Sequence, residues 1–115
     1  MRGNSGDKIR LRHILDAIGE IESYLIDANF DSFIANSMMR FACVKQLEII
    51  GEAGNHISNA TKNEFSEIEW KQITGLRNVL IHEYFGIDAK LVWQILHIDI
   101  PALKTKIESI LQSFS

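Results

Sequence analysis

A long amphipathic stretch runs from Ser37 to about Ala60 and has the sequence SMMRFACVKQLEIIGEAGNHISNA. Its apolar and small residues return every three or four positions, which is the spacing of one buried face on an α-helix. They are Phe41, Val44, Leu47, Ile50, Gly54 and Ile57. The stretch therefore predicts a long helix that packs one face against other helices.

The segment before this stretch repeats the pattern. Asp7 can cap a first helix that extends to about Ala28. Its apolar stripe consists of Leu11, Ile14, Leu15, Ile18, Ile21 and Leu25. Turn-forming residues fill Asn29 to Asn36, with room for one short helical turn, and Thr61 to Phe65 forms a polar connection.

Helix signals continue to the end of the chain. Residues 66–69, Ser-Glu-Ile-Glu, have the form of a capping box, so we expect a third helix to begin there and to end at Gly86. Asp88 can cap a fourth helix. Pro101 lies inside the last apolar pattern and predicts a kink or break near Asp99–Ile100. The sequence thus predicts an all-α antiparallel bundle of four to five helices.

Composition bounds the class of protein. The 115 residues, 46% of them hydrophobic, fit one globular domain over residues 1–115, with residues 1–6 as a mobile N-terminus. No apolar run is long enough to cross a bilayer, and no signal-peptide core is present. The single cysteine, Cys43, fits a reducing cytoplasm and is expected to be a buried small hydrophobe. We therefore expect a cytoplasmic protein with no membrane partner.

The net charge of −3 counts against a high-affinity, sequence-independent nucleic-acid binder. Any function on a nucleic acid must therefore rest on a local site or on positive charge that assembly concentrates. The densest basic patch is Lys8, Arg10 and Arg12, and its alternation with apolar residues favours the solvated face of a helix.

The stretch of residues 77–84 combines three reactive side chains. Arg77 can hold phosphate through its fork of N–H donors, His82 can exchange protons near neutral pH, and Tyr84 offers a phenol. On an ideal helix Arg77 and His82 lie ~140° apart around the axis and ~7.5 Å apart along it. They therefore do not share a helix face. If they act together, either the helix turns before Gly86 or a second copy of the chain completes the site.

Ordinary structural roles also fit these residues. Arg77 would then pair with Glu69 or Glu83 at the surface, while His82 and Tyr84 would be packing residues. The spacing alone does not decide between these roles and a site.

The wider stretch, residues 70–88, closely resembles the HEPN superfamily and, within it, the HepT-type toxins. The resemblance also covers residues 47–53, Val92-Trp93 and residues 99–101. The family motif R-x4-H-x-Y is matched by Arg77, His82 and Tyr84.

This resemblance implies a helical bundle that forms a homodimer, with the motif in a cleft between the two copies. It implies a metal-independent endoribonuclease toxin with Arg77 and His82 as catalytic residues, and no cofactor is expected. From the residues themselves, Asn78 shares a helix face with His82 and could orient its imidazole or bind phosphate, and Glu52 could support the motif helix from its neighbour. The resemblance further implies a small nucleotidyltransferase antitoxin as partner, which silences the toxin by transferring AMP to Tyr84. The alternative is a catalytically inactive helical module that binds the nucleotidyltransferase, and a third is a simple dimerisation domain.

Other polar clusters give weaker signals. Glu48, Glu52 and His56 recur every four residues on one helix face, but a structural role is favoured over metal ligation, and no metal is predicted. His13 and His97 are expected to be surface or packing residues. Trp70 and Trp93 are expected to anchor the core rather than to stack on bases.

Overall fold

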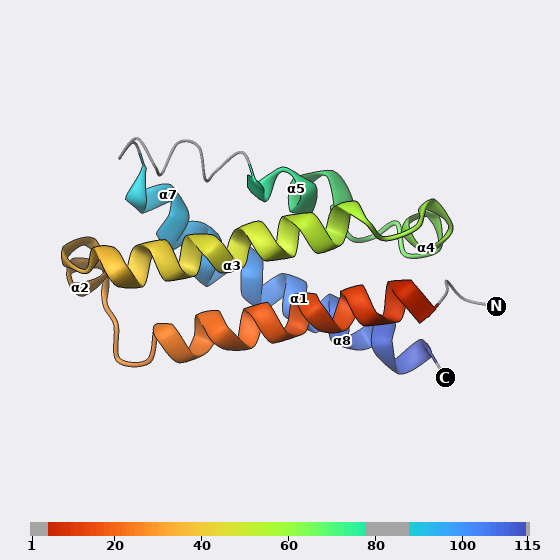
Figure 1. The fold of residues 1–115 in the computed structure, drawn as a ribbon, viewed down its shortest axis with the longest axis horizontal. Helices are drawn as coiled ribbons and strands as arrows, with labels where there is room; N and C mark the ends of the chain where they lie inside the picture. Colours follow the sequence, from red (N-terminus) through yellow and green to blue (C-terminus); the bar gives the residue numbers. More distant parts are fainter. Residues whose placement is uncertain (1–4, 78–87, 115) are drawn as a thin grey trace.

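Two long antiparallel helices form one layer of the protein (Figure 1). The structure is a computed structural model that describes residues 5–77 and 88–114. The helices are α1, Ser5–Tyr24, and α3, Ser37–Asn55, joined through the short helix α2, Phe30–Ala35. Asn29 caps α2 in a reciprocal capping box with Ser32. The short helical turn expected between Asn29 and Asn36 is thereby confirmed.

The first helix is shorter than predicted. It ends at Tyr24, and Asp27 takes a left-handed backbone with φ of 63°, which cannot continue a right-handed helix. At the other end, Ser5 and Gly6 already belong to α1, while residues 1–4 lie outside the described part. The predicted extension to Ala28 is therefore wrong.

Thr61 to Phe65, predicted as a polar connection, is mostly helical. α3 ends at Asn55 rather than near Ala60, and a separate helix, α4, covers Asn59–Glu64. The cause is Ser58, whose backbone is extended and whose hydroxyl accepts the Thr61 N–H at 3.3 Å. Ser58 thus ends one helix pattern and starts another.

The capping box predicted at residues 66–69 does not form. Residues 65–67 are turns, and α5 begins only at Trp70 and runs to Thr74. Burial explains the delay: Ile68 and Trp70 both enter the core, and the Trp70 indole N–H donates to the Phe65 carbonyl at 3.1 Å. The turn that buries these side chains leaves Ser66 outside any helix.

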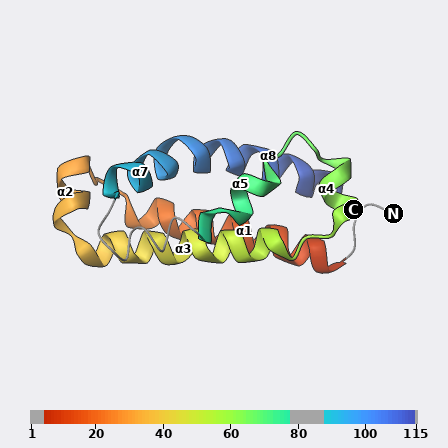
Figure 2. The same cartoon turned by 90° about the horizontal axis from the view of Figure 1, so that it is seen from above.

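The last helices form the second layer, which is seen edge-on in Figure 2. α7, Ala89–Gln94, begins at the predicted cap Asp88, whose side chain accepts the Leu91 N–H at 2.8 Å. A π-helical turn, η1, follows over Ile95–Asp99, and α8 covers Ile100–Ser113. Pro101 lacks the N–H that a regular α-helix would use, so the irregularity predicted at this proline is confirmed as a π turn.

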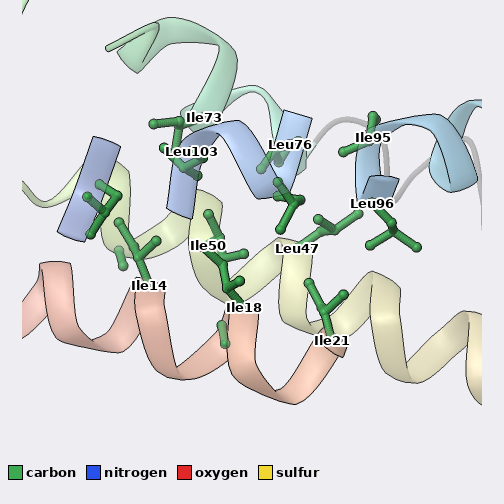
Figure 3. Packing of buried hydrophobic residues seen from close by; sticks show 14 of the residues in the cluster. Ile14, Ile18, Ile21, Leu47, Ile50, Ile73, Leu76, Ile95, Leu96 and Leu103 are labelled. Atoms are coloured by element: carbon green, nitrogen blue, oxygen red, sulfur yellow. The ribbon is translucent and has the colours of Figure 1, made fainter. Parts of the chain in front are cut away.

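A single apolar core fills the space between the layers. Figure 3 shows Ile14, Ile18 and Ile21 of α1 facing side chains of α3 and of the second layer. Most of the predicted stripe residues are buried, but Phe41 is 44% exposed because the neighbouring Cys43 and Val44 take the inward positions. All regular elements of the described residues are helices, which confirms the all-α prediction. None of these helices is long and apolar enough to span a membrane.

Candidate active site

Two glycines of α3 bring Arg77 close to that helix. A Cβ on Gly54 would lie 2.6 Å from Ile73 Cγ2, and one on Gly51 would lie 3.1 Å from Arg77 Cγ. α5 can approach α3 this closely only because neither position carries a side chain. The buried Leu76 fixes the segment in the core, and Arg77 follows at the surface. Helix packing therefore sets where the Arg77 guanidinium lies.

Arg77 pairs with Glu52 rather than with Glu69. Its Nη1 donates to Glu52 Oε2 at 2.7 Å, and both side chains are about half exposed. In the described part of the chain Arg77 forms no pair with Glu69, and Glu83 lies outside that part. The predicted supporting residue Glu52 and the predicted catalytic Arg77 are thus in direct contact.

Glu52 also contacts His56. Its Oε1 lies 3.1 Å from His56 Nε2, one helical turn along α3. The Arg77 hydrogen bond is the largest cause of a lowered Glu52 pKa, partly opposed by desolvation and supported by the charges of Arg77 and His56. Glu52 is therefore an anion at neutral pH, and it links a guanidinium to an imidazole.

This arrangement leaves Arg77 able to bind an anion. A guanidinium has five N–H donors, and Glu52 engages one nitrogen. The exposed remainder of the fork suits a phosphate oxygen. The site thus offers a positioned cation at the protein surface.

The structure does not describe the other residues of the predicted motif. Asn78, His82, Tyr84 and Gly86 lie outside the described residues, so their predicted roles stay predictions. The contact between Glu52 and His56 was not predicted as part of this site. Its signal was the four-residue spacing, which places both side chains on one helix face and favoured a structural role over metal ligation.

The remaining candidates have structural surroundings. Within residues 5–77 and 88–114, no group of three His, Cys, Asp or Glu side chains could hold a metal ion, and Glu48 pairs instead with Lys45 at 2.7 Å. Cys43 is fully buried, and burial raises the pKa of its thiol to about 11, so it is no nucleophile.

The aromatic and histidine predictions can also be placed. Trp70 is buried, and Trp93 packs against Phe33 with ring centroids 5.1 Å apart, so both contribute to the core. His97 is a packing residue whose ring lies 3.9 Å from that of Trp93. His13 is exposed on α1.

Comparison with known proteins gives a consistent match. The model of the family described as Ribonuclease HepT-like matches residues 14–110. A protein of Methanocaldococcus jannaschii, provisionally named as an RNase, is 42% identical over 88% of this chain and 93% of its own length. One of Thermococcus cleftensis, provisionally named ribonuclease HepT, is 39% identical over 87% of this chain and 91% of its own.

A third relative, from Caldanaerobacter subterraneus, is also provisionally named as an RNase. It is 34% identical over 89% of this chain and 91% of its own length. No solved structure matches the chain significantly. The family match spans most of the chain, from the middle of α1 to the end of the core face of α8, and includes Arg77 and Glu52. This chain therefore belongs to the Ribonuclease HepT-like family.

Proposed function

We propose that the chain is a metal-independent endoribonuclease that acts as the toxin of a toxin–antitoxin pair in the cytoplasm. The observation that carries the proposal is the Arg77 guanidinium, held at the surface by Glu52 in a chain of the Ribonuclease HepT-like family. Relatives provisionally named as RNases match over about nine-tenths of both chains. Arg77 is also the first residue of the R-x4-H-x-Y motif.

In the proposed reaction Arg77 binds the scissile phosphate. The ribose 2′-hydroxyl attacks phosphorus and loses its proton to a base, the bond to the 5′-oxygen breaks, and that oxygen gains a proton. His82 serves as the base or as the acid in these steps, and such proton transfer typically contributes 10²–10⁴-fold in rate. Arg77 stabilises the charge that grows on the phosphoryl oxygens. The products are a 2′,3′-cyclic phosphate and a free 5′-hydroxyl.

Glu52 and Asn78 support this chemistry in the proposal. The ion pair restricts the Arg77 side chain to one orientation, so less conformational freedom is lost when phosphate binds. Asn78 lies four positions before His82, on the same side if the segment is helical, where its amide would orient the imidazole.

We further propose that a small nucleotidyltransferase is the antitoxin and that it modifies Tyr84. The phenol oxygen would attack the α-phosphorus of ATP, form a phosphodiester to AMP and release pyrophosphate. The added negative charge would lie seven residues from Arg77, where the RNA phosphate must bind. Two copies of the chain would form the working dimer, as in the family that the sequence resembles.

The test is cleavage of total RNA and tRNA in excess EDTA by the wild type and by His82→Ala. The intact mass is measured first, because an added AMP would itself inhibit. We expect cleavage by unmodified wild type and a loss of at least about 100-fold in His82→Ala. Equal cleavage by both proteins would contradict the assigned role of His82. Inactivity of folded, unmodified wild type would favour the inactive module that binds a nucleotidyltransferase.

Co-expression gives a second arm of the test. We expect a nucleotidyltransferase encoded beside the toxin to co-purify and to raise the mass of wild type, but not of Tyr84→Phe, by one or more AMP units. An unchanged wild-type mass under these conditions would contradict the proposed modification.

A further inference from the structure

A groove of about 480 Å³ opens between α1 and α3, beside the ion pair of Arg77. α1 contributes Ile9, Arg10 and His13 to its lining. α3 contributes Ile49, Glu52 and His56. Because Glu52 lines the groove and also binds Arg77 at 2.7 Å, the groove is continuous with the candidate active site.

Nitrogen donors dominate the polar lining of this groove. Arg10 is half-buried, and its Nη1–H donates to the Gly6 carbonyl at 3.2 Å, which leaves other N–H donors of the guanidinium available. His13 stands across from the α3 side with an exposed ring, and His56 lies beside Glu52. The carboxylate of Glu52 is already matched by Arg77. The groove therefore favours an anion along its α1 side.

The rest of the lining is apolar. Ile9 of α1 is 53% exposed, and Ile49 of α3 lines the same groove. An apolar floor beside nitrogen-rich side chains suits an unpaired nucleotide, whose base has an apolar face and whose phosphate is anionic. A free anion would gain no favourable contact from the exposed Ile9 side chain.

We infer that this groove binds the single-stranded RNA segment adjacent to the scissile phosphate. One base lies on Ile9 and Ile49, and its phosphate is bound by Arg10 and His13, while Arg77 holds the reacting phosphate. The inference rests on the proposed function for the identity of the ligand. It also explains how a chain of net charge −3 can bind RNA, because Arg10 lies in the groove and Arg77 lies beside it, joined to the groove residue Glu52.

The test measures binding without cleavage. A fluorescent single-stranded RNA with 2′-O-methyl groups lacks the attacking hydroxyl, and anisotropy gives its Kd over a series of salt concentrations. Arg10→Gln, His13→Gln and the double variant are compared with wild type. The matched control is Arg12→Gln, because Arg12 is an exposed arginine of the same helix that does not line the groove.

We expect the double variant to bind about tenfold more weakly and to lower the slope of log Kd against log salt by about one, as expected for lost phosphate contacts. Arg12→Gln should stay within about twofold of wild type. Within the described residues His13 forms no hydrogen bond that His13→Gln would remove, so the unfolding midpoint of this variant should match that of wild type. His13→Gln alone should weaken binding by about threefold, which keeps the test valid if Arg10→Gln unfolds.

Three results would overturn the inference. One is an equal loss of RNA affinity in the groove variants and in Arg12→Gln. Another is the absence of RNA binding by the wild type. The third is a change in oligomeric state on light scattering that accounts for the loss, since the groove would then be a contact between copies. Failure of the proposed function would look different: wild type would bind the RNA through Arg10 and His13 but would not cleave its unmodified counterpart.

Discussion

Two carboxylates near the same end of the helical layer differ in almost every physical respect. Asp7 on α1 is 2% exposed and accepts hydrogen bonds from the Ser58 N–H at 2.9 Å, the Ser58 hydroxyl at 2.6 Å and the Thr61 hydroxyl at 2.6 Å. Glu52 on α3 is half exposed and faces Arg77 and His56. These donors to Asp7 are two hydroxyls and a backbone amide, whereas Glu52 contacts a guanidinium and an imidazole.

The comparison indicates that Asp7 stabilises the fold, whereas Glu52 orients a side chain of the candidate site. A buried carboxylate must keep its donors, because losing them leaves a charge without compensation in the core. An exposed ion pair adds little to stability, so its partners can be exchanged for a ligand. The Asp7 cluster joins α1 to the α3–α4 junction, while the Glu52 pair leaves Arg77 accessible. Substitution of Asp7 should therefore lower the free energy of unfolding, whereas substitution of Glu52 should lower activity and leave stability nearly unchanged.

The largest effect is expected for Asp7→Ala. The change leaves the fully buried Thr61 hydroxyl and the Ser58 N–H without their carboxylate acceptor, which should cost about 2–4 kcal/mol in the free energy of unfolding. Urea unfolding monitored by circular dichroism gives the value. Asp16→Ala is the control, because Asp16 is an exposed aspartate of the same helix, and it should stay within about 0.5 kcal/mol. Similar losses in both variants would remove the contrast between the two carboxylates.

Next comes the helix contact that positions Arg77. In Gly54→Ala the new Cβ would lie 2.6 Å from the buried Ile73, so α5 must shift away from α3, at about 1–3 kcal/mol. In Gly19→Ala nothing lies within 4 Å of the new Cβ, and helix propensity should stabilise the protein by about 0.5–1 kcal/mol. Thermal unfolding of both variants measures the difference. A stabilised Gly54→Ala would show that the close approach is not needed.

Much of this fold follows from helix periodicity, and the failures have local causes. The three–four spacing located the buried face of α1 and most of that of α3, since burial of one stripe is what holds a helix in a bundle. Periodicity could not show that Ser58 divides α3 from α4, because a cap depends on the extended backbone of one residue. The capping-box pattern at Ser66 was outweighed by the burial of Ile68 and Trp70. A local cap thus decided the first boundary, and tertiary packing decided the second.

The candidate site was only partly predictable for a related reason. Arg77 and Glu52 could each be singled out, but they are 25 positions apart, and their contact depends on how closely α5 packs on Gly51 and Gly54. The four-residue spacing of Glu52 and His56 places them on one helix face, but it does not show that Arg77 joins them. Side chains from different helices meet through packing, which a single sequence does not display.

A smaller effect, and one on activity rather than stability, is expected for Glu52→Gln. The amide can still accept from Arg77 but carries no charge, so the guanidinium becomes less firmly oriented and kcat for RNA cleavage should fall about tenfold with a smaller change in KM. The unfolding midpoint should barely move, because the pair is exposed. Glu20→Gln, an exposed glutamate of α1, is the control for the lost charge. If the unfolding midpoint fell as in Asp7→Ala while kcat held, Glu52 would be a residue of the fold.

The smallest expected effect is the pH dependence of the Glu52 pair. The pKa of Glu52 is lowered chiefly by the hydrogen bond from Arg77, so its contribution to stability is present above the carboxyl's ordinary pKa and is lost as the pH falls through the lowered value. The small stability difference between wild type and Glu52→Gln should therefore be constant from pH 7 to about 5 and vanish in stronger acid. The carbon-13 shift of the Glu52 carboxyl, followed against pH by NMR, reports the titration directly. In Arg77→Gln this titration should move to higher pH, because the main cause of the lowering is gone, while that of Glu20 should not move. An unchanged Glu52 titration in Arg77→Gln would mean that the two side chains do not pair in solution, and the comparison with Asp7 would then lose its exposed member.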